Sequence, residues 1–98
     1  MTKAHGPITP GEILLTEFLE PLGISQYRLA QATALSQTRI SEIVRGKRAI
    51  TTETALRLSK ALGVDDRYWI NIQTDYDLEV ERNLHADALA KVTTLVAR

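Results

Sequence analysis

The stretch from Gln26 to Gly46, QYRLAQATALSQTRISEIVRG, constrains the fold of this chain more than any other segment. Ser25 and Ser36 each stand where a side chain caps the start of a helix, and Gly46 is placed to end the second one. Apolar residues in the second half recur at the i, i+3, i+4 spacing of a helix with one buried face. The stretch therefore predicts two short helices, 26–33 and 37–45, joined by a tight turn.

This spacing is typical of a helix-turn-helix, in which the second helix enters the major groove of DNA. An ordinary pair of bundle helices would explain the apolar positions Leu29, Ile40 and Ile43 equally well. It would not explain the opposite face of the second helix, which is almost continuously polar. Side chains of these types bond the edges of bases. The residues predicted to contact bases are Gln37, Thr38, Arg39 and Ser41.

Basic residues gather directly after this second helix, although the chain holds 12 basic and 12 acidic residues. Residues 1–63 contain eight Lys or Arg against five Asp or Glu, whereas residues 64–98 contain four against seven. Phosphates flank the groove that a recognition helix enters. The predicted phosphate contacts from charge and position are Ser36, Arg45, Lys47 and Arg48. A merely solvated basic face is the alternative, and Glu42 would repel phosphates if it faced them.

Helix signals recur along the rest of the chain. Thr9-Pro10-Gly11-Glu12 has the composition of a helix start, and Pro21 is expected to end that helix near residue 19. A fourth helix begins at Thr51 or Thr52 and ends at residue 63, and a fifth opens at Asp65 and extends to about residue 84 or beyond. The expected fold is all-α with five helices.

These elements are expected to form one domain, with an arm at 1–8, a helix-turn-helix core at 9–63, and a C-terminal helix and tail at 64–98. The last stretch, VTTLV, fits either a helix stripe or a short strand. The final helix carries more apolar residues than a small core needs from it, which predicts a homodimer formed through this region on a palindromic site. The predicted dimer contacts are Trp69, Ile72, Leu78 and Leu84.

Composition argues against several other functions. The chain has no cysteine, which excludes disulfides and thiolate metal sites and suits the cytoplasm. It has no apolar run of the roughly 20 residues that span a bilayer, and no secretory signal is expected because MTKAHGPITPGE lacks the apolar stretch of one. The alternating acidic residues Asp75 to Glu81 would not converge on a helix, so no metal or cofactor is expected. No catalytic arrangement of side chains can be argued, so an enzyme is not expected.

Three stretches of the chain resemble the lambda-repressor-like, or Cro-like (XRE), helix-turn-helix family, and within it the HigA-type antitoxins. They are PGEILLTEFLEPLGIS at 10–25, RISEIVRGKRAITTETALRLSKALG at 39–63 and YWINIQTDYDLE at 68–79. The resemblance implies the antitoxin of a type II toxin–antitoxin system. Such a protein represses its own operon and neutralises a RelE-fold, mRNA-cleaving toxin of the HigB type.

The same resemblance implies roles for individual residues. Gln26 would contact a phosphate, and Gln37 would contact a base with Thr38 beside it. Ala34 departs from the pattern, because many relatives carry glycine in this turn, and a left-handed alanine costs about 1 kcal/mol. Two alternatives stay open: a stand-alone XRE-type regulator without a toxin, and an interaction module that does not bind DNA.

Overall fold

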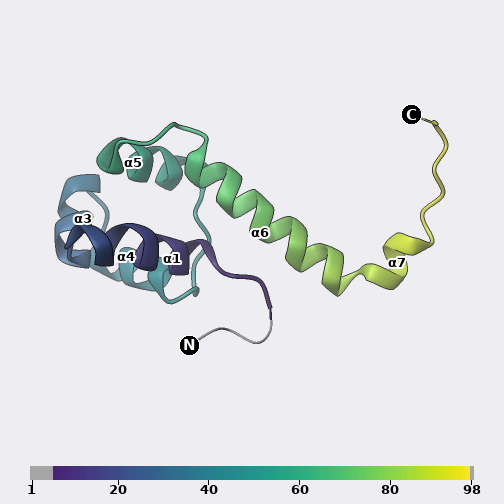
Figure 1. The fold of residues 1–98 in the computed structure, drawn as a ribbon, viewed down its shortest axis with the longest axis horizontal. Helices are drawn as coiled ribbons and strands as arrows, with labels where there is room; N and C mark the ends of the chain where they lie inside the picture. Colours follow the sequence, from purple (N-terminus) through teal and green to yellow (C-terminus); the bar gives the residue numbers. More distant parts are fainter. Residues whose placement is uncertain (1–5, 98) are drawn as a thin grey trace.

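The computed structural model describes residues 6–97 as a chain of helices, shown in Figure 1. The helices are α1 (Pro10–Ile13), η1 (Leu14–Leu19), α2 (Glu20–Leu22), α3 (Gln26–Thr33), α4 (Gln37–Val44), α5 (Thr52–Leu62), α6 (Tyr68–Leu84) and α7 (Ala86–Ala90). The described residues contain no strand, which confirms the all-α class. Residues 1–5 of the expected arm, and residue 98, lie outside the described part of the chain.

Four helix starts lie where the capping residues predict them. In each case a hydroxyl oxygen accepts a hydrogen bond from the backbone N–H three residues later. The capping residues are Thr9 (3.1 Å), Ser25 (3.0 Å), Ser36 (3.0 Å) and Thr51 (3.3 Å). The two alternatives for the fourth start are thereby resolved in favour of Thr51 as the cap.

The predicted end of the first helix near residue 19 is wrong. The backbone stays helical through η1 and α2, and it stops only where Gly23 adopts a left-handed conformation with φ 65°. Within η1 the turns are π-helical, and the N–H of Glu20 bonds the carbonyl of Leu15, five residues back. In an α-helix the ring of Pro21 would clash with the carbonyl four residues earlier. The wider π-helical turn relieves that clash, so the proline is accommodated.

The core draws on every major helix of the body. Its buried apolar residues are Leu14, Leu19, Leu29, Ala30, Ile40, Ile43, Ile50, Ala55, Leu58 and Trp69. The Trp69 side chain is fully buried, and its ring lies 5.2 Å from that of Phe18 and 5.1 Å from that of Tyr68. The core therefore extends beyond the expected boundary at residue 63. The assignment of Trp69 to a dimer contact is corrected, because the core leaves it no surface for a partner.

Gly11 sets how closely the first helix approaches α4. It is buried, and a Cβ atom at this position would overlap the backbone carbonyl oxygen of Ile43. Only glycine allows two helix backbones to pass at this distance. The C-terminal end of α4 is thereby fixed against α1.

The long helix α6 leaves the body and carries α7 and the C-terminal end away from it (Figure 1). It begins at Tyr68 rather than at Asp65, because the Asp65 carboxylate accepts from the N–H of Arg67 (2.8 Å) in a preceding turn. Residues 91–97 form neither a helix nor the alternative strand, since a strand requires a neighbour to bond with. Within the described residues, no helix combines the length and apolar character needed to cross a bilayer.

Candidate nucleic-acid interface

The turn between α3 and α4 depends on one strained residue. Ala34 adopts φ 59° and ψ 33°, and among the described residues no other non-glycine residue has a positive φ. The turn is therefore left-handed despite the absence of glycine. Such a conformation costs an alanine about 1–2 kcal/mol, which the burial of Leu29, Ile40 and Ile43 in the two flanking helices offsets.

A shallow depression on the surface spans both helices of the pair. It is lined by Gln26 from α3 and by Gln37, Thr38, Ser41 and Arg45 from α4 and its C-terminal end. Two carboxamides, two hydroxyls and a guanidinium thus share one exposed surface. These are the donor and acceptor groups that bind base edges and phosphates in protein–DNA complexes. Five of the nine residues predicted to contact DNA are brought together here.

Two of the other four predicted contacts, Ser36 and Arg39, belong to the cap and first turn of α4 but lie outside this depression. Arg39 is half-buried and stands about 200° around the helix from Gln37, on the flank next to the core. Ser36 is exposed, and its hydroxyl oxygen accepts the N–H of Arg39 (3.0 Å) as a helix cap. That hydroxyl retains a proton that it can donate to another acceptor.

The basic residues after α4 differ in how free their charges are. Arg48 forms an ion pair with Glu42, with 2.7 Å from Nη2 to Oε1 and 2.8 Å from Nε to the same oxygen. The repulsion expected between Glu42 and phosphates is thereby neutralised by Arg48. Arg45 and Lys47 are exposed, and neither makes an ion pair with another described residue. Of the predicted phosphate contacts, these two therefore have the more available charges.

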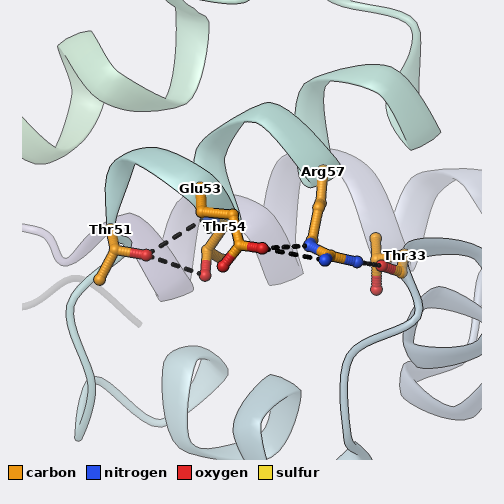
Figure 2. Close-up of polar contacts among 5 residues, drawn as sticks. All are labelled: Thr33, Thr51, Glu53, Thr54 and Arg57. Atoms are coloured by element: carbon orange, nitrogen blue, oxygen red, sulfur yellow. Dashed lines mark hydrogen bonds and ion pairs between the residues drawn. The ribbon is translucent and has the colours of Figure 1, made fainter.

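The sequence did not indicate that α5 holds the turn. Arg57 reaches from α5 and donates from Nη1 to the backbone carbonyl of Thr33 (2.8 Å), at the C-terminal end of α3. Figure 2 shows the Arg57 guanidinium between this carbonyl and the carboxylate of Glu53, which accepts from its Nη2 at 2.9 Å. The spacing of Glu53 and Arg57 by four residues signals their ion pair. The partner on α3 requires the tertiary structure.

A second contact of this kind, also missed, lies at the other flank of α4. The side chain of Gln73, on α6, is buried, and its Oε1 accepts from the backbone N–H of Ile50 (2.8 Å). Its Nε2 donates to the Asp77 carboxylate (2.9 Å). The sequence contains a signal for the burial of Gln73, since this residue follows Trp69 by four positions and so lies on the same inward face of the helix.

A polar recognition helix that packs on a second short helix and is supported by further helices is the arrangement of a DNA-binding helix-turn-helix domain. Comparison with known families agrees with this arrangement. The model of the helix-turn-helix family matches residues 15–69, more than half of the chain. The chain belongs to this family.

Individual relatives show which members of the helix-turn-helix family this chain is similar to. The chain is 52% identical over 73 residues to virulence-associated protein I of Dichelobacter nodosus, covering 74% of this chain and 68% of that protein. It is 37% identical over 81 residues to antitoxin HigA-1 of Vibrio cholerae, covering 83% and 76%. The solved structure of Pseudomonas aeruginosa antitoxin HigA with the higBA promoter superposes with a TM-score of 0.85 at 33% identity, covering 92% of this chain and 99% of that one. These similarities confirm the resemblance to HigA-type antitoxins.

Proposed function

We propose that this chain is the antitoxin of a type II toxin–antitoxin system and represses its own operon by binding operator DNA. The observation that carries the proposal is the depression shared by Gln26, Gln37, Thr38, Ser41 and Arg45, on the exposed face of the recognition helix. The similar Pseudomonas antitoxin is described together with its promoter, which supports the same use of this surface.

The exposure of each side chain suggests its role. Gln37 and Thr38 are exposed on α4 and would contact bases, with the half-buried Ser41 beside them. Arg45 and Lys47, with Gln26 and the Ser36 hydroxyl, would hold the flanking phosphates. A base contact by Arg39 stays a prediction, since this residue lies on the flank of α4.

We propose that two copies of the chain bind a palindromic operator. One helix-turn-helix contacts too few base pairs to select a site within a genome, and a two-fold dimer places two recognition helices about 34 Å apart. The far part of α6 and the segment after it supply exposed apolar side chains for this contact. They are Leu78, Leu84, Leu89, Val92, Leu95 and Val96. Ile72 is half-buried against the core and would contribute at most its outer edge.

Binding to DNA from upstream of the gene that encodes the chain tests this function. We expect a footprint with two-fold symmetry on that fragment, and Gln37→Ala to weaken its binding by about 1–3 kcal/mol, with little effect on random DNA of equal length. The matched control is Gln31→Ala, which changes an exposed glutamine of α3 outside the depression. Equal losses on both DNAs would assign Gln37 to the DNA backbone instead.

We further propose that the chain neutralises a RelE-fold ribonuclease encoded beside it. The acidic residues 64–98 offer a surface complementary to a basic toxin, although the first helix is an equally available surface. Co-expression with the product of the neighbouring gene, followed by purification through a tag on this chain, should yield a complex. Absence of that complex, with operator binding intact, would support the stand-alone regulator.

A further inference from the structure

We propose that Gln73 is a positioning residue for DNA binding. It fixes the basic segment 45–50 to α6, and thereby sets the half-site spacing that a dimer can bind. This inference rests on the proposed operator binding, and it adds a residue outside the DNA surface that determines which operators fit. Its basis is the contact between Gln73 and Ile50.

The Ile50 end of this contact anchors the segment that carries the free positive charges. Residues 47–51 have no regular secondary structure, so few backbone bonds hold them. The N–H of Lys47 bonds the carbonyl of Glu42 (2.8 Å) at the start of the segment, and the N–H of Ile50 bonds Gln73 at its end. Ile50 is itself buried in the core, with 5% of its surface exposed. A buried N–H without a partner is costly, so this bond determines where the segment runs.

The α6 end of the contact is held in one orientation. Because the Gln73 amide donates to Asp77, its oxygen is directed at Ile50 rather than its nitrogen. The two elements also face each other across a small pocket, whose lining includes Lys47, Arg48 and Ala49 on one side and Gln73, Tyr76 and Asp77 on the other. The basic segment therefore follows the position of α6.

This link matters because α6 also leads into the proposed dimer contact. The distance between the phosphate ligands of two subunits is set by the dimer axis and by the path from that axis back to α4. A bond in that path affects binding most when both subunits must fit one DNA molecule simultaneously. Loss of the Gln73 contact should thus impair binding to a complete operator more than binding to a single half-site.

The test uses the full-length Gln73→Leu variant, which removes both hydrogen bonds while nearly preserving side-chain volume. The probes are the footprinted fragment from the chain's own promoter and the same fragment with one half-site scrambled. We expect a loss of about tenfold or more on the complete operator and of less than about twofold on the single half-site. In the free protein, amide exchange at Ile50 should accelerate about tenfold or more.

Two further variants separate positioning from folding. Asp77→Ala removes only the contact that orients the amide, and should cost less than Gln73→Leu. The double variant Gln73→Glu/Asp77→Asn reverses the donor and acceptor between these positions, and it preserves both the bond to Ile50 and the net charge. We expect it to recover most of the operator affinity and the slow exchange at Ile50.

The outcomes are distinguishable. If the unsubstituted protein binds no promoter DNA, the proposed function fails, and the positioning role fails with it. If that protein binds but Gln73→Leu loses equal affinity on one and two half-sites, Gln73 has only a structural role and the inference is overturned. Full affinity in Gln73→Leu, or no recovery in the double variant, would overturn it as well.

Discussion

Helix α6 joins two regions that differ in whether their apolar side chains are buried. In the body, residues 9–73, ten apolar side chains are buried in one core, and the inner end of α6 contributes Trp69 to it. In the outer segment, residues 81–97, every residue is exposed, including Leu84 at 69% and Leu95 at 91%. The chain thus completes its core before α6 ends. The apolar residues beyond that point stay largely exposed in the described chain, which supports their burial by a second copy.

The largest effect is expected in the body. Gly11→Ala should destabilise the protein by about 3 kcal/mol or more, because the new methyl group overlaps the backbone carbonyl of Ile43 and the two helices must separate. Urea denaturation followed by circular dichroism measures it. The control is Gly23→Ala, where the added methyl group would meet no atom within 4 Å apart from its chain neighbours. There only the φ of 65° opposes the change, at a cost of about 1 kcal/mol. Equal stability of the two variants would show that the body is less tightly packed than described.

Truncation after Val80 tests the separation between the two regions. A cut after Gly63 would remove Trp69 from the core, so it would report on folding rather than on assembly. We expect the truncated chain to keep its helical signal and a buried Trp69, to sediment as a monomer where the full chain is a dimer, and to bind the operator about 100-fold or more weakly.

A point variant serves as the matched control for this truncation. Leu84→Asp in the full-length chain places a charge on an exposed apolar position and should also yield a folded monomer. A full-length protein that remains monomeric at tens of micromolar, or a truncated one that remains dimeric, would contradict the assignment of the dimer contact to the outer segment.

Local chemistry explains why much of the body could be predicted from the sequence. A helix start depends on residues within one turn, so Thr9, Ser25 and Ser36 suffice to locate three helices. The polar face of α4 follows from helix periodicity alone, which is why Gln37 and Thr38 could be assigned to its exposed face.

The failures have a different origin, because no short-range sequence pattern signals them. The first helix continues past Pro21 because the preceding turns are π-helical, and no local sequence pattern predicts such turns. Trp69 fits either a core or an interface by its type, and only the tertiary packing that buries it fully, with Phe18 against its ring, decides between them. The contacts of Arg57 with Thr33 and of Gln73 with Ile50 join residues 24 and 23 positions apart, beyond the range of any helix pattern.

A smaller effect is expected on the salt dependence of DNA binding, and it tests whether the DNA contacts lie in the body. Arg45→Ala and Lys47→Ala should each reduce the magnitude of the slope of log Kobs against log salt by about 0.9, since each removes one free phosphate ligand. The double variant Arg48→Ala/Glu42→Ala deletes a neutral ion pair and should leave the slope nearly unchanged. Arg82→Ala, on the far part of α6, is the control from the other region. An unchanged slope after loss of both Arg45 and Lys47 would assign these residues another purpose.

The smallest effect is a gain in stability at the turn of the recognition unit. Ala34 has φ 59°, so Ala34→Gly should relieve about 1–2 kcal/mol of left-handed strain. Glycine also gains conformational freedom in the unfolded chain, worth about 0.4–1 kcal/mol, so the expected net stabilisation is about 0.5–1 kcal/mol. Ala32→Gly is the control, because Ala32 is exposed within α3, where the same change should destabilise by about 1 kcal/mol. Thermal and urea denaturation of both variants should give shifts of opposite sign. Destabilisation by both would show that the methyl group of Ala34 makes packing contacts worth more than the strain it imposes.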